Sequence, residues 1–156
     1  MGFSLMFMRT DGDAQADGDR EALRAFLDSR GLQVKAGPYG GEIVDTDDKA
    51  LTFDGHFTDL SLDPLDKDEP ISGGIDHATL SDEECAFIYD LCVAAGFLIV
   101  NPQGDPLFVV PGGNHTADQV PDGGEVAWVS SPAELVEALS GNFQRFLDFK
   151  RQVIGD

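Results

Sequence analysis

The sequence predicts an α+β fold, in which three to four helices pack on a largely antiparallel sheet. Three observations support this prediction. Short β-type runs alternate with turn-rich segments, capping boxes open two helical stretches, and a hydrophobic content of 42% with 11 Phe supplies a core. The length of 156 residues suits a single acidic globular domain spanning residues 1–156.

The N-terminal part is expected to form a strand, a loop and a helix. Residues 3–8 alternate Phe and Leu with other side chains, which is typical of a strand with a buried face. Residues 11–19 are small, polar and acidic and predict a loop. A helix should then run from about Asp19 to Arg30, because apolar residues recur at helical spacing and Gly31 can end it.

The middle of the chain contains short β-type pieces separated by acidic turns. Asp54-Gly55 between two of these pieces indicates a hairpin. Glycine pairs, such as the one at 73–74, are interpreted as turn residues with positive φ. Along the chain we expect a strand at 32–34, a turn at 37–41, strand pieces at 42–44, 50–53 and 57–62, a loop at 63–70 and an apolar piece at 75–80.

Two capping boxes indicate helices in the C-terminal half. The box at 81–84 predicts a helix over 81–95. The box at 131–134 predicts a helix to about Leu139, and Gly141 is expected to separate it from a last helix. Between the two boxes we expect a buried hairpin of 97–100 with 107–110, a polar loop at 112–124 and a strand at 125–129.

The cysteines and the N-terminus indicate a cytoplasmic protein. Cys85 and Cys92 lie seven residues apart in a predicted helix, roughly 10 Å along its axis, so a disulfide is excluded and both thiols should be reduced and buried. A secretory signal carries positive charge before its apolar stretch, whereas Arg9 follows the apolar stretch here. The longest apolar run, 91–100, is too short to cross a membrane.

The charge points to a basic partner. With 29 acidic and 10 basic residues, the net charge is −19 and the pI is about 4.1, so nucleic acid and anionic membranes would be repelled. The stretch 42–69 alone holds ten acids and two lysines, a net charge of −8, interleaved with aromatic residues. From this stretch we predict a partner-binding face of Asp45, Asp47, Asp48, Phe53, Asp54, Phe57, Asp59, Asp63 and Asp66.

Physical chemistry gives this face a function, and two alternatives to that function stay open. A concentrated acidic field raises encounter rates with a basic protein by roughly 10- to 10³-fold at low salt, and aromatic side chains beside it supply desolvated contacts. Alternatively, Asp is common because it favours turns. The ratio of 21 Asp to 8 Glu, with only four lysines, is also expected of a generic domain adapted to high salt.

Motifs for catalysis or for a resident metal or cofactor are lacking in the sequence. No nucleophile elbow, phosphate-binding loop, dinucleotide fingerprint or zinc motif occurs. Residues 11–22 have the spacing of a calcium loop, but Ala16 and Ala22 replace its glycine and its bidentate glutamate. The alternative that stays open is a small enzyme of unrecognised class, in which His77 or His115 works beside a carboxylate in a glycine-lined cleft.

In size and composition, the chain resembles the immunity proteins of bacterial toxin systems, which are small, acidic, cytoplasmic α+β domains without catalytic residues. The resemblance implies a non-catalytic protein that neutralises a basic toxin domain by covering its active site. We therefore predict binding to a basic protein, with no nucleic acid, membrane, metal or cofactor as a ligand.

Overall fold

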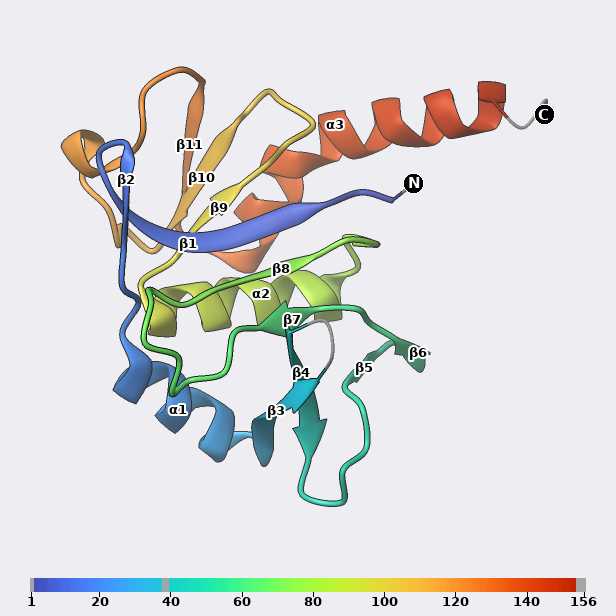
Figure 1. Ribbon diagram of the computed structural model, residues 1–156. Helices are drawn as coiled ribbons and strands as arrows, with labels where there is room; N and C mark the ends of the chain where they lie inside the picture. The colour runs from blue at the N-terminus through green and yellow to red at the C-terminus, as the bar shows by residue number, and fades with distance from the viewer. Residues whose placement is uncertain (1, 38–39, 154–156) are drawn as a thin grey trace.

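The computed structural model describes residues 2–37 and 40–153 and has the predicted α+β fold (Figure 1). One large sheet has the strand order β11-β10-β9-β1-β8-β7-β4-β3, and β2 pairs with β1. All neighbouring strands are antiparallel except β10 and β11. The strands are β1 (Leu5–Asp11), β2 (Ala14–Ala16), β3 (Leu32–Gly37), β4 (Gly40–Asp45), β7 (Ser61–Leu62), β8 (Ser72–Ile75), β9 (Leu98–Val100), β10 (Phe108–Pro111) and β11 (Val126–Val129), while β5 (Thr52–Phe53) and β6 (His56–Phe57) form a separate hairpin.

Strand β1 lies in the middle of the sheet, between β8 and β9. Its alternation buries Leu5 and Phe7, as the sequence predicts. The strand extends further than expected, and the acidic segment after it is not all loop. A turn at Gly12, with φ of 65°, folds β2 back on the end of β1.

Three helices, α1 (Arg20–Ser29), α2 (Asp82–Ala95) and α3 (Pro132–Val153), cover one face of the sheet, with α2 packed between the other two (Figure 1). The predicted caps are confirmed, because the Asp19 and Ser81 side chains accept hydrogen bonds from the first turns of α1 and α2. The predicted break at Gly141 is wrong. A helical glycine costs only about 1 kcal/mol, and Phe143 beyond it packs its ring 5.3 Å from that of Phe3.

The glycine pair at 73–74 is not a turn, and its position corrects the sequence-based interpretation. Both residues lie inside β8, and neither has a positive φ. A Cβ on Gly73 would lie 2.6 Å from the backbone oxygen of Ser61 and 2.7 Å from Leu62 Cδ2. The pair therefore permits the close approach of β7 and β8.

The core lies mainly between the sheet and the helices. A smaller cluster on the opposite face contains Leu98, Phe108 and Val110, and Val120 from the loop after β10 covers it; this loop includes the 3₁₀ turn η1 (Ala117–Gln119). Both cysteines are buried and unpaired, as predicted. Burial raises the pKa of Cys85 to about 12 and also raises that of Cys92, so neither thiol is reactive. Within the described residues, no helix combines the length and apolarity that a membrane crossing requires.

Candidate functional site

The Asp54-Gly55 hairpin sends two phenylalanines to opposite environments. Asp54 and Gly55 have φ of 51° and 79°, which is the backbone of a tight two-residue turn. In the resulting register Thr52 pairs with Phe57. Phe53 is only 6% exposed, and its ring centre lies 5.4 Å from that of Phe87. Phe57 is 83% exposed. Phe53 therefore belongs to the core, because the pleat of the hairpin turns it inward, and Phe57 is the ring that this hairpin presents to solvent.

The hairpin is attached to the beginning of α2. The Asp54 N–H donates to Glu83 Oε2 at 2.7 Å. Glu84 lies next to it but is buried, and its Oε2 accepts from the N–H groups of Thr79 and Leu80 at 2.9 and 2.7 Å. Burial raises the pKa of Glu84 despite these hydrogen bonds. The two glutamates thus fix the position of the hairpin and of the segment that enters α2.

Asp59 holds His77 on the same side of the molecule. Asp59 Oδ2 lies 2.6 Å from His77 Nδ1, and Oδ1 accepts from the backbone N–H groups of Asp76 and His77, both at 3.2 Å. Partial burial raises the pKa of Asp59, but the hydrogen bonds from His77 and the two N–H groups outweigh it, so the pKa is lowered overall. The partner of His77 is therefore Asp59 and not the adjacent Asp76. This hydrogen bond leaves Nε2 of a neutral His77 as the basic nitrogen.

Two hollows meet around these groups. One, of about 260 Å³, is lined by Phe57, His77 and Glu84, and the other, of about 500 Å³, by Asp59 and Asp76; Thr58 lines both. We define the Phe57 surface as Phe57 with the carboxylates that flank it, namely Asp54, Asp59, Asp76 and Glu83.

The carboxylates of the Phe57 surface are nearly devoid of cationic partners. Asp54, Asp76 and Glu83 form no ion pair with any residue that the structure describes. Asp59 pairs only with His77, which carries charge only when protonated. An exposed aromatic ring amid unneutralised carboxylates is complementary to a cationic protein surface with an apolar patch.

Several other predicted face residues have local structural roles. Asp45 Oδ1 accepts from the N–H groups of Asp47 and Lys49 and so closes the turn after β4. Asp48 occupies a left-handed position in that turn, with φ of 60°, and Lys35 Nζ lies 3.8 Å from its Oδ1. Asp47 is exposed. These three residues are turn formers, as the alternative based on turn preference holds.

Asp63 and Asp66 lie at the other end of α2. Asp63 Oδ2 accepts from the Ser72 N–H at 2.8 Å and pairs with Lys67. The Arg20 guanidinium at the start of α1 donates to the backbone oxygens of residues 65, 67 and 69. That end of α1 is bound to the last residue of α2 by the hydrogen bond from Asp19 N–H to Ala95. The 14 residues of α2 separate the two ends by about 21 Å, so the nine predicted residues do not form one continuous face.

The structure adds Asp76 and Glu83 to the site, although both lie outside the acidic stretch 42–69. A weak signal for Glu83 exists in the sequence, because it belongs to the capping box that places α2. Asp76 is brought in by the pairing of β7 with β8, which no local pattern predicts. Among the described residues, no cluster of three or more His, Cys, Asp or Glu side chains has the geometry of a metal site.

His115 is a structural residue. The Nδ2 group of Asn114 donates to Phe97 O at 2.8 Å, so its Oδ1 faces His115 Nδ1 at 2.7 Å as an acceptor. His115 Nε2 accepts from the Thr10 N–H at 3.2 Å. Both ring nitrogens are therefore engaged in the neutral form. Burial lowers the pKa of His115, and the charge of Arg9 lowers it further.

No protein-family model matches the chain, and neither a curated protein nor a solved structure shows significant similarity to it. The functional argument therefore depends on the surface geometry alone.

Proposed function

We propose that the protein is a non-catalytic, cytoplasmic binding protein that neutralises a basic partner, as toxin immunity proteins do, and that the Phe57 surface contacts this partner. The observation that carries the proposal is the exposed Phe57 ring, 83% accessible, on a hairpin flanked by carboxylates without fixed cations. Contacts of this kind place a hydrophobic anchor at the centre and complementary charge around it.

The distribution of charge supports a functional role for part of the acidity. Elsewhere several acids are neutralised, as in the pairs of Asp17 with Arg20 and Asp90 with Arg30, at 2.9 Å each. At the Phe57 surface the carboxylates instead lack basic partners among the described residues. Self-repulsion there is relieved when a cationic surface covers the patch.

The experiment co-expresses the chain with the protein encoded by the adjacent gene, which the proposal takes as the toxic partner. We expect growth arrest with the adjacent protein alone, growth with both, and a defined complex on size exclusion. A variant with Asp54→Asn, Asp76→Asn and Glu83→Gln should lose protection, because three charges leave the surface while each amide oxygen can still accept. The matched control is Asp11→Asn, Asp118→Asn and Asp122→Asn, which makes the same net change at exposed sites near η1. Equal protection by the two variants contradicts the proposal.

A second candidate function rests on the Asp59–His77 pair. A carboxylate 2.6 Å from Nδ1, beside a hollow of about 260 Å³ that also contains Ser81, is an arrangement that can serve general-base catalysis. Ser81 Oγ already accepts the capping hydrogen bond from Glu84 N–H. Hydrolysis of p-nitrophenyl acetate by the wild type and by His77→Gln tests this candidate. A rate that follows the titration of His77 and is lost in the variant supports an enzyme, and identical rates exclude this chemistry on that ester.

A further inference from the structure

Strand β3 has an open edge. It is the last strand on its side of the sheet, and no other strand in the described part of the chain pairs with its outer edge. On its inner edge Val34 lies opposite Ile43, whose carbonyl accepts from Leu51 N–H at 3.1 Å on the far side of β4. Ile43 thus directs its backbone groups away from β3, and in an antiparallel ladder its opposite residue does likewise. By alternation, the N–H and C=O groups of Leu32, Val34 and Ala36 point outward.

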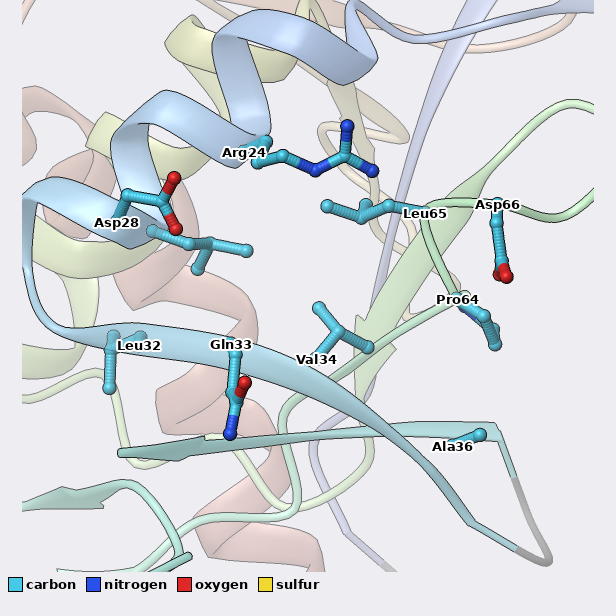
Figure 2. A pocket seen from close by; sticks show the side chains of 10 residues that line it. Arg24, Asp28, Leu32, Gln33, Val34, Ala36, Pro64, Leu65 and Asp66 are labelled. Atoms are coloured by element: carbon cyan, nitrogen blue, oxygen red, sulfur yellow. The ribbon is translucent and has the colours of Figure 1, made fainter. Parts of the chain in front are cut away.

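A pocket of about 430 Å³ lies beside this edge, between β3, α1 and the loop at 64–66 (Figure 2). Leu32 and Val34 line it together with Leu27 and Leu65, so its walls are largely apolar. Gln33, whose side chain alternates to the other side of the strand, also lines it. The pocket therefore reaches the open edge of β3 and does not end beneath the sheet.

Two carboxylates lie at opposite ends of the pocket. Figure 2 shows Asp28 on α1 near Leu32, and Asp66 on the loop toward Ala36, with the Arg24 guanidinium between them near Leu65. Neither Asp28 nor Asp66 forms an ion pair with a residue that the structure describes. Residues i and i+2 of a strand lie on one face about 7 Å apart. An added strand would therefore present three side chains opposite Leu32, Val34 and Ala36.

We propose that β3 binds an extended segment of the basic partner as an additional strand, and that the segment has the pattern basic-x-apolar-x-basic. The apolar side chain enters the pocket beside Val34, and the flanking bases face Asp28 and Asp66. Backbone pairing supplies affinity and the pocket supplies selectivity, as in other strand-addition interfaces. A second copy of this chain does not fit, because each copy carries a charge of −19.

This inference rests on the proposed function, since it assigns a segment to the same partner. The two surfaces adjoin through a hollow of about 320 Å³ that Leu32 lines together with Glu83. Glu83 is the residue that holds the Asp54 N–H. A partner centred on Phe57 is therefore continuous with one that reaches the beginning of β3.

The test titrates the ¹⁵N-labelled full chain with an acetylated, amidated peptide, Thr-Lys-Thr-Leu-Thr-Lys-Thr. We expect the largest amide shifts at residues 32–36. N-methylation of the peptide leucine should weaken binding about tenfold, because it removes one backbone hydrogen bond. N-methylation of the preceding threonine, whose N–H points away from β3, should change the dissociation constant less than about twofold. A peptide with Glu in place of both Lys should bind at least about tenfold more weakly.

Variants of the chain separate the inference from the proposed function. The double variant Asp28→Lys, Asp66→Lys should weaken peptide binding, whereas Asp118→Lys at η1 should not. Absence of shifts at 32–36 at millimolar peptide, or equal weakening by the two N-methyl groups, overturns the inference and leaves the Phe57 surface intact. Peptide binding at β3 combined with full protection by the Phe57-surface triple variant overturns the proposed function and leaves strand addition standing.

Discussion

Two phenylalanines of one hairpin offer a sharp test of the proposed surface. Phe53 and Phe57 lie four residues apart, yet Phe53 is 6% exposed and Phe57 is 83% exposed. The same substitution, Phe→Ala, should therefore act on stability at one position and on binding at the other.

The structure sets the magnitudes. Phe53 loses a ring packed on Phe87 at 5.4 Å, and truncation of a buried Phe costs about 3–5 kcal/mol of unfolding free energy. Phe57 loses only a cross-strand contact with Thr52, worth about 0.2–1 kcal/mol. If Phe57 is the anchor of the interface, its removal weakens binding by about 2 kcal/mol, which raises the dissociation constant roughly 30-fold.

The assays are urea unfolding of both variants and calorimetric titration of the folded Phe57→Ala variant with the adjacent gene's product. The reasoning predicts a loss of stability for Phe53→Ala and a loss of affinity with near-normal stability for Phe57→Ala. An unchanged dissociation constant for Phe57→Ala would refute the role of the ring. Comparable destabilisation by both variants would refute the placement of the hairpin.

Other predictions concern the fold and its charge. The pKa of His115 lies below its ordinary value, so the unfolded chain takes the proton first; stability should fall below about pH 6.5 by up to about 1.4 kcal/mol per pH unit, and this part of the slope of unfolding free energy against pH should vanish in His115→Gln. Glu84→Ala leaves two buried or partly buried N–H groups without their acceptor and should cost about 1–3 kcal/mol in urea unfolding; Glu84→Gln, which keeps an acceptor oxygen, should recover most of it, and equal losses would contradict the assigned role. Gly73→Ala should destabilise the domain by separating β7 from β8, whereas Gly141→Ala, with open space around its Cβ, should stabilise α3 by up to about 1 kcal/mol. A cooperative unfolding transition in 10 mM salt is expected for a functional acidic patch, and a chain that folds only in molar salt would instead favour salt adaptation.

Local signals in the sequence predict much of the fold. Ser81 and Asp19 cap the helices that follow them, and Asp54-Gly55 forms the expected turn. Each of these features depends on side chains within a few residues of one another, so the sequence contains the needed information. The same holds for the alternation that buries Leu5 and Phe7.

The failures occur where distant packing overrides local preference. Gly141 is a weak helix residue, but the contact of Phe143 with Phe3, 140 residues away in sequence, favours a continuous α3. Gly73 looks like a turn residue, but strand β7 requires its missing side chain. Residues that share a surface are hardest to predict, because Asp76 reaches the Phe57 surface through strand pairing and Asp66 is carried away by the contacts of Arg20.

The most direct test of the proposed function is the rate of association with the adjacent gene's product as a function of ionic strength. For the wild type, the rate constant should fall steeply between 20 mM and 500 mM salt. The variant with Asp54→Asn, Asp76→Asn and Glu83→Gln should associate about tenfold more slowly at 20 mM salt and converge on the wild type at 500 mM. The variant with Asp11→Asn, Asp118→Asn and Asp122→Asn should follow the wild type closely; identical salt dependence for the two triple variants would contradict a partner that docks on the Phe57 surface.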